Sequence, residues 1–267
     1  MQSPLIFDSH SHYNDPRFFG DEMNDLKMSR DELIAYLLKN GVGKILCAGT
    51  DIATSRECIE LAERFDGVYA AAGIHPHDTE LVKNKAECIK ELISLLRHKK
   101  VVAIGEIGLD FHYDFSDRLI QMEWLDLQLR LAKECNMPVI IHDREAHGAT
   151  YDIISRYPEV RGVIHSYSGS AESAAMLVKR GYYISFSGTV TFKNASSVVL
   201  AAKAVPLDKL LIETDAPYLS PAPNRGKINH SGNLVYTAER IAEIRGISTN
   251  EVIEATYNNA KTLFGIE

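Results

Sequence analysis

Two histidines near the start of the sequence are spaced so that one metal ion could bind both. The first apolar run leads into Asp8-Ser9-His10-Ser11-His12. Side chains two positions apart in a strand point to the same face, so His10 and His12 would leave one face together. Imidazole is the commonest metal ligand in proteins, but two surface histidines just past a strand end are an equally good interpretation of this motif alone.

Further histidines and carboxylates stand at or just beyond the ends of other short apolar runs: His75, His77, Glu106, His142, His165 and Asp215. Any one of them alone is more typical of a hydrogen-bonded structural residue or a helix cap. Together with the first pair they provide enough imidazoles and carboxylates for two divalent ions, spaced about 3.5–4 Å apart and bridged by one carboxylate. The predicted chemistry is metal-assisted hydrolysis.

The elements that would position these residues alternate between strand and helix along the chain. After the first strand, strands are expected at 44–49, 68–74, 101–107, 138–142, 162–166, 182–187 and 209–214. Helices are expected from Ser29 to Gly41 and at 51–65, 84–98, 116–136, 145–157, 170–180, 194–204, 232–245 and 248–263. Such nearly continuous apolar strands are typical of a parallel sheet that is covered on both faces.

The alternation predicts an α/β fold, a (β/α)8 TIM barrel of the metal-dependent hydrolase type, as a single domain over residues 1–267. The C-terminal ends of all barrel strands share one rim, which would gather the histidines and carboxylates. An open, doubly wound sheet is the alternative. No Gly-x-Gly-x-x-Gly turn follows a strand, and polar residues follow many strands rather than one switch point, which argues against the open sheet.

Composition limits the class of protein. A chain of 267 residues with 45% hydrophobic content can bury a large core, and no linker divides it. A net charge of −7 argues against a broad basic surface for duplex nucleic acid, although a nuclease that trims a chain end needs few phosphate contacts. The four cysteines form no Cys-x-x-Cys pair, and no signal or membrane segment is apparent, so a reduced, cytoplasmic protein is expected.

Six motifs resemble the series that marks the TatD family of metal-dependent deoxyribonucleases. They occur in family order and span nearly the whole chain. They are Asp8-Ser9-His10-Ser11-His12, Gly73-Ile74-His75-Pro76-His77, Gly105-Glu106-Ile107-Gly108-Leu109-Asp110, Ile141-His142-Asp143-Arg144, His165-Ser166-Tyr167-Ser168-Gly169 and Glu213-Thr214-Asp215-Ala216-Pro217-Tyr218-Leu219.

The resemblance implies a TIM-barrel hydrolase related to the amidohydrolases, in which Glu106 bridges two ions. One ion would be held with His10, His12 and Asp215, and the other with His142 and His165. Asp215 would also accept the proton of the attacking water. His75 would face the substrate and contact its phosphate or leaving group.

Four residues are candidates for substrate contact or support. His77 would either contact substrate or brace its loop. Arg144 offers a fork of donors that matches a phosphate, with a salt bridge to Asp110 or Glu145 as an equal alternative. Tyr113 and Asp110 would line the pocket or orient ligands.

Two further features concern the substrate. Bases could stack on Phe111, Tyr113 and Tyr167. Residues 227–232 read Lys-Ile-Asn-His-Ser-Gly where the family commonly has a stretch like Arg-Asn-Glu-Pro, which puts in doubt any substrate contact of that loop.

Three functions are compatible with these features. The first is a 3′-to-5′ exonuclease on single-stranded or frayed DNA, with Mg²⁺ for activity and Zn²⁺, Mn²⁺ or Ni²⁺ as further ions that histidine-rich sites accept. The second keeps the metal site but cleaves D-aminoacyl-tRNA or another ester or amide. The third is a non-catalytic binding protein. No membrane and no obligate protein partner is expected.

Overall fold

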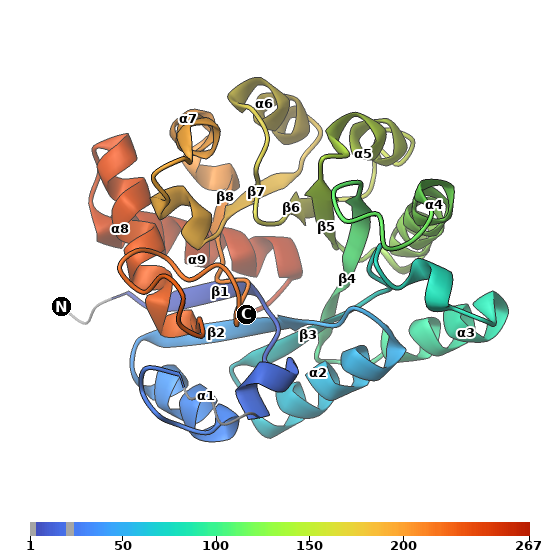
Figure 1. The fold of residues 1–267 in the computed structure, drawn as a ribbon, viewed down its shortest axis with the longest axis horizontal. Coiled ribbons are helices and arrows are strands. Elements are labelled where there is room, and N and C mark those ends of the chain that lie inside the picture. Colours follow the sequence, from blue (N-terminus) through green and yellow to red (C-terminus); the bar gives the residue numbers. More distant parts are fainter. Residues whose placement is uncertain (1–3, 20–23) are drawn as a thin grey trace.

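A computed structural model describes residues 4–19 and 24–267 (Figure 1). Within these ranges the strands form one sheet in which each strand pairs, in parallel, with the next in the sequence. They are β1 (Ile6–Ser11), β2 (Val42–Ala48), β3 (Val68–Ala72), β4 (Val101–Asp110), β5 (Val139–Arg144), β6 (Gly162–Ile164), β7 (Tyr183–Phe186) and β8 (Leu210–Ile212). The predicted order of strands is confirmed.

The sheet curls round until β8 meets β1. The contact consists of a parallel bridge between Ser11 and Ala216 and a hydrogen bond of 2.7 Å from the His12 N–H to the Ala216 carbonyl. The Ser9 hydroxyl also donates to the Ile212 carbonyl at 2.9 Å. The fold is therefore a nearly closed (β/α)8 barrel, as the sequence predicts.

Helices surround the ring of strands on its outer side (Figure 1). They are α1 (Arg30–Lys39), α2 (Ile52–Arg64), α3 (Lys85–Leu95), α4 (Arg118–Cys135), α5 (His147–Ile154), α6 (Ala171–Lys179), α7 (Ser196–Ala204), α8 (Leu234–Arg245) and α9 (Thr249–Phe264). Several begin at a side chain that accepts a backbone N–H, which satisfies a donor of the first turn: Asp51, Asn84, Asp117, Ser170 and Ser248.

Two apolar cores hold the barrel together. The larger lies between the strands and the surrounding helices. The smaller takes residues from all eight strands and therefore fills the barrel interior. Leu263 and Phe264 of α9 belong to this inner core, and the Phe264 ring lies 6.1 Å from that of Phe7 in β1. No helix in the described part of the chain combines the length and the apolar character that crossing a membrane requires.

The ends of the strands differ from the predicted ends by up to three residues, and the differences in β4 and β8 bear on the site. β4 continues to Asp110, so Glu106 lies inside the strand rather than at its end, because pairing with β5 persists through Gly108 opposite His142. A Cβ on Gly108 would lie 1.9 Å from the His142 carbonyl oxygen, so only glycine allows this approach. β8 ends at Ile212, because Asp215 adopts a left-handed backbone conformation (φ +55°) that no strand accommodates.

Candidate active site

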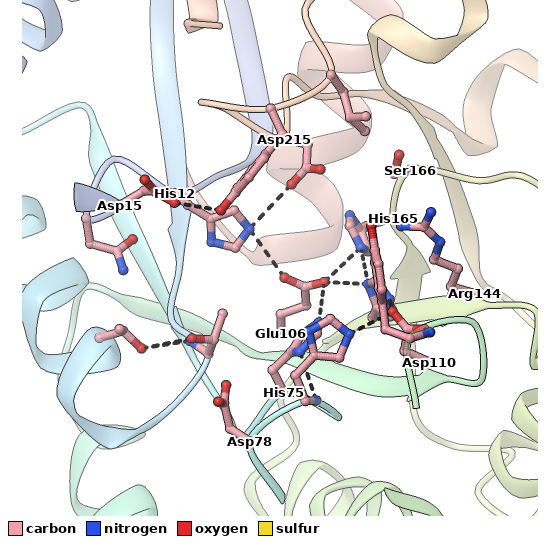
Figure 2. Close-up of a pocket in the computed structure, with 18 of the residues that line it drawn as sticks. His12, Asp15, His75, Asp78, Glu106, Asp110, Arg144, His165, Ser166 and Asp215 are labelled. Atoms are coloured by element: carbon pink, nitrogen blue, oxygen red, sulfur yellow. Dashed lines mark hydrogen bonds and ion pairs between the residues drawn. The ribbon is translucent and has the colours of Figure 1, made fainter. Parts of the chain in front are cut away.

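A cavity of about 1270 Å³ opens where the strands end, and Figure 2 shows Glu106 near its centre. His10 is fully buried and lies within the same cluster of ligand atoms, although it does not line the cavity. The other predicted site residues line it: His12, His75, His77, Glu106, Tyr113, His142, Arg144, His165 and Asp215. The structure thus brings together residues that are separated by more than two hundred positions, such as His12 and Asp215.

Glu106 lies between two pairs of imidazoles, one pair for each carboxylate oxygen. Its Oε1 is 2.8 Å from His142 Nδ1 and 2.9 Å from His165 Nε2. Its Oε2 is 3.3 Å from the Nε2 atoms of both His10 and His12. A carboxylate that divides its oxygens in this way has the arrangement required to bridge two ions.

Asp215 faces the first of these pairs from the β8 side of the barrel. Its Oδ1 is 3.6 Å from His10 Nε2 and 3.4 Å from His12 Nε2. The left-handed turn at Asp215 fixes the side chain in place, because its own N–H donates to the His10 carbonyl at 3.0 Å. The three residues together offer ligand atoms within 4.8 Å of one another.

Three histidines of the cluster each donate a hydrogen bond to a group outside it. The ring nitrogen that donates carries the proton, so the other ring nitrogen faces the cluster with a lone pair. His12 Nδ1 donates to the Ala48 carbonyl at 2.9 Å, and His165 Nδ1 donates to Glu213 at 3.1 Å. His142 Nε2 donates to Asp110 at 3.2 Å. Such outward bonds are typical of metal-ligating histidines, because they fix the tautomer and the orientation of the ring.

The inward nitrogens converge closely. His10 Nε2 and His12 Nε2 are 3.0 Å apart, as are His142 Nδ1 and His165 Nε2. The protons of His142 and His165 are directed outward, so the two nitrogens of this pair face each other with their lone pairs, which repel. A cation bound between the two nitrogens would replace this repulsion by attraction. The donor set of imidazole nitrogens and carboxylate oxygens therefore fits divalent metal ions.

Both carboxylates of the cluster remain ionised. Burial raises the pKa of Glu106, but its interactions with the surrounding histidines, His165 foremost, outweigh burial and hold this pKa well below its ordinary value. Burial likewise raises the pKa of Asp215, but its interactions with the nearby histidines, His12 foremost, lower this pKa overall. The cluster therefore holds two buried negative charges, which favour bound cations.

His75 differs from the four inward-facing histidines. Its Nδ1 accepts the His77 N–H at 3.2 Å, so its proton sits on Nε2, which lies 3.4 Å from Glu106 Oε1. Burial lowers the pKa of His75 to about 4, which keeps the ring neutral. His75 can therefore donate a hydrogen bond from Nε2 into the cavity. His77 instead donates to Asp110 at 2.8 Å, the bracing contact that was one of its two predicted roles.

Arg144 forms neither of the salt bridges offered as alternatives to phosphate binding. Asp110 accepts from His77 and His142, and Glu145 pairs with His112 at 2.7 Å. The guanidinium instead lies over the ring of Tyr113, 4.6 Å from its centroid. Within residues 4–19 and 24–267 no carboxylate pairs with it, so its donors are available to a ligand.

Tyr167 is buried, which makes its predicted role in base stacking wrong. Only 2% of the residue is exposed, and its hydroxyl donates to the Ser170 carbonyl at 2.8 Å. The ring packs toward Phe186 of β7, which places it in the core. Its position two residues after His165 gave no indication of this, because a loop side chain can point either way.

Two carboxylates that sequence reasoning left without a role support the cluster from outside. Glu213 accepts from His165 Nδ1 and from the Ser166 N–H at 2.7 Å. Asp8 accepts from the Thr214 hydroxyl at 2.6 Å, and burial raises its pKa to about 7. A carboxylate within a predicted apolar strand is buried and must therefore form hydrogen bonds or ion pairs. This rule was the sequence signal that could have identified Asp8 and Glu213 as supporting residues.

The divergent loop 227–232 supports the Asp215 turn. Asn229 Nδ2 donates to the Thr214 carbonyl at 3.0 Å and to the Tyr218 carbonyl at 2.8 Å. The Ser231 hydroxyl donates to Asp8 at 2.7 Å. These bonds tie the loop to the residues on either side of Asp215.

Comparisons with known proteins agree with this geometry. The model of the TatD related DNase family matches residues 7–265. The uncharacterized metal-dependent hydrolase YabD of Bacillus subtilis is 41% identical over 268 residues, which cover 98% of this chain and all of YabD. The 3′-5′ ssDNA/RNA exonuclease TatD of Shigella flexneri is 35% identical over 89% of this chain and 93% of its own. The crystal structure of YjjV, a TatD homologue from Escherichia coli, superimposes with a TM-score of 0.88 at 32% identity and covers 98% of both chains.

Proposed function

Because the chain belongs to the TatD family of metal-dependent hydrolases, we propose that it is a 3′-to-5′ exonuclease that hydrolyses phosphodiester bonds at single-stranded or frayed DNA ends. The observation that carries the proposal is Glu106, whose two oxygens face two separate pairs of imidazoles. Two ions held in this way suit the in-line displacement of phosphodiester hydrolysis. The named activity of the Shigella flexneri relative supports DNA as the substrate.

The size of the cavity also supports a polymer end as substrate. Its volume of about 1270 Å³ exceeds the roughly 300–1,000 Å³ of ordinary small-molecule pockets. The cavity is open at the barrel rim, where a chain end can enter without the duplex contacts that a net charge of −7 disfavours.

In this proposal the cluster would hold two divalent ions. Glu106 would contribute to both, His10, His12 and Asp215 would hold one ion, and His142 and His165 would hold the other. Mg²⁺ is proposed for activity, and the imidazole ligands also suit Zn²⁺, Mn²⁺ and Ni²⁺. Such ions lower the pKa of water and offset the charge of the reacting phosphate.

The side chains of the cavity then have separate tasks. Asp215 takes the proton of the attacking water on a carboxylate oxygen, since it is ionised and faces the cluster. The neutral His75 keeps its proton and donates a hydrogen bond from Nε2 to a phosphate or leaving-group oxygen. Arg144 binds a phosphate with its free donors and Tyr113 lines the substrate path, while His77 keeps Asp110 oriented.

The test is digestion of single-stranded DNA oligomers labelled at the 3′ or the 5′ end. Metal-stripped protein is re-supplied with Mg²⁺, Mn²⁺ or Zn²⁺, beside an Asp215→Asn variant and an Asp114→Asn control whose carboxylate pairs with Arg118 outside the cavity. We expect metal-dependent shortening from the 3′ end that only Asp215→Asn abolishes. Folded protein that leaves DNA intact with every ion contradicts the proposal, and release of D-amino acid from D-aminoacyl-tRNA would then identify the same site as a deacylase.

A further inference from the structure

Two aromatic rings lie stacked and exposed at the edge of the cavity. Tyr113 and Phe115 are 47% and 66% exposed, and their rings are nearly parallel, at 15° with centroids 5.3 Å apart. Both side chains line the cavity. Adjacent exposed apolar faces beside a cavity are typical of a ligand contact. We call this pair the aromatic platform.

The platform is attached to the metal-ligand cluster through Asp110. Asp110 Oδ1 accepts the N–H of Tyr113 at 2.9 Å, and Oδ2 accepts from His77 and from His142. The His77 ring meets both platform rings edge to face, with centroids 5.6 Å from Tyr113 and 4.9 Å from Phe115. Because one carboxylate holds the loop, the bracing ring and a cluster histidine, the platform has a fixed position relative to the reacting bond.

A cationic group accompanies the platform. The Arg144 guanidinium lies 4.6 Å from the Tyr113 ring centroid and is free of carboxylate partners among the described residues. Since Phe115 stacks on Tyr113 and Arg144 lies over the Tyr113 ring, a base would stack on the exposed Phe115 ring or on the plane of the guanidinium. The free guanidinium donors would then bind the anionic phosphate of the same nucleotide.

The opposite wall of the cavity also carries an aromatic ring under a guanidinium, although this guanidinium, of Arg17, pairs with Asp15 at 3.6 Å. In Figure 2, Asp15 and Arg144 lie on opposite sides of Glu106. Asp15 Oδ2 accepts the Tyr218 hydroxyl at 2.7 Å, and the Arg17 guanidinium lies 4.0 Å from the Tyr218 ring centroid. Tyr218 is 38% exposed and lines the cavity, so aromatic surface borders the cluster on both sides.

We propose that the aromatic platform and Arg144 form a subsite for one unstacked nucleobase and its phosphate, next to the bond that is cleaved, and that Tyr218 receives a neighbouring base on the opposite wall. The subsite rests on the proposed function for its substrate class. In a duplex, adjacent bases are stacked on one another, so only an unpaired, unstacked end can place two neighbouring bases on opposite walls of the cavity. The subsite thus selects single-stranded ends.

Binding of a fluorescent single strand tests the subsite without requiring cleavage. The probe is a short thymidine oligomer with a 3′-terminal 2-aminopurine and phosphorothioate linkages, titrated with metal-loaded protein. Tyr113→Ala should weaken binding by roughly 5- to 150-fold and remove the quenching of 2-aminopurine, because Phe115 and Arg144 lose the ring that holds them in the platform and the stacking contact with the base is lost. Tyr113→Phe keeps the ring and should bind like the native protein. Tyr36→Ala, which removes a tyrosine that is 40% exposed on α1, is the matched control outside the cavity.

The contribution of Arg144 can be measured separately, through the salt dependence of binding. Arg144→Ala should weaken binding and reduce the slope of log affinity against log salt by about 0.7, the value for one phosphate contact on a single strand. Tyr113→Ala should leave that slope unchanged. Native affinity and quenching in Tyr113→Ala would overturn the subsite, as would equal affinity for a blunt duplex.

The two proposals fail differently. If the native protein binds the probe through Tyr113 but leaves unmodified DNA intact, the subsite stands and the exonuclease proposal falls. If DNA is shortened from the 3′ end and Tyr113→Ala binds the probe as the native protein does, the exonuclease stands and the subsite falls.

Discussion

Replacing Asp110 by asparagine should weaken metal binding although Asp110 itself is not a ligand. Its Oδ1 accepts backbone N–H groups, which an asparagine oxygen can continue to do. Its Oδ2 accepts from His77 Nε2 and His142 Nε2, where Asp110→Asn would present a donating amide instead. His142 can then accept from that amide only by moving its proton to Nδ1, the atom that lies 2.8 Å from Glu106 and faces the cluster.

The expected loss follows from that tautomer. A proton on His142 Nδ1 must be displaced before the ring can bind an ion, and removal of such an outer partner typically costs about 10- to 100-fold in metal affinity. This corresponds to about 1.4–2.7 kcal/mol of binding free energy. The metal-free fold should also lose stability, because hydrogen bonds to a buried carboxylate contribute roughly 1.5–3 kcal/mol each.

Calorimetric titration of metal-stripped protein with Mn²⁺ measures the effect, and circular dichroism shows that each variant is folded. Asp114→Asn is the matched control, since Asp114 lies four residues away, pairs with exposed Arg118 and does not line the cavity. We expect a loss only in Asp110→Asn. Native affinity in a folded Asp110→Asn variant would refute the assignment of the His142 tautomer.

Three further outcomes are expected. Glu106→Gln removes the charge shared by both imidazole pairs, so metal content measured by mass spectrometry should fall to background; retention of two ions would exclude Glu106 as the bridge. Burial lowers the pKa of His230 in the folded state, so below pH about 6.5 the unfolded chain binds a proton at this residue more readily than the folded chain. His230 therefore makes the free energy of unfolding fall as the pH drops below about 6.5. The difference in melting temperature between the native protein and His230→Asn should therefore narrow from pH 8 to pH 5, and a constant difference would contradict the shift. Gly108→Ala, at φ +148° and against the His142 carbonyl, should lower the free energy of unfolding by at least about 1–3 kcal/mol, and an unchanged urea midpoint would refute this.

Much of the fold could be predicted because parallel barrel strands are buried on both faces and appear in sequence as short apolar runs. The cluster could be predicted for a related reason, since residues such as His10 and His165 follow such runs and all strand ends share one rim. The order of the strands follows from sequential pairing, and the only orientation that the cluster prediction used was the alternation that places His10 and His12 on one strand face.

Orientation is what the sequence left open. The sequence Asp143-Arg144-Glu145 does not show whether Arg144 forms a salt bridge or stacks on Tyr113. In the structure Glu145 pairs with His112, and Arg144 lies over the Tyr113 ring. The burial of Tyr167 depends on the packing of its loop against β7. The extension of β4 to Asp110 depends on pairing with β5. Each of these is decided by a partner distant in sequence.

The contact between β1 and β8 also determines when, during synthesis, the cluster of histidines and carboxylates can be completed. Asp8 and Thr214 are 206 positions apart, and their hydrogen bond lies beside His10 and Asp215, which belong to the same group of ligands. Synthesis runs from the amino end, so a growing chain carries the first histidines long before it carries Asp215. Bringing the two ends together is the long-range step of such a topology and comes at the cost of chain entropy. A chain released before its last strand would therefore lack Asp215, one of the proposed ligands, and we expect it neither to bind both proposed ions nor to hydrolyse the proposed substrate.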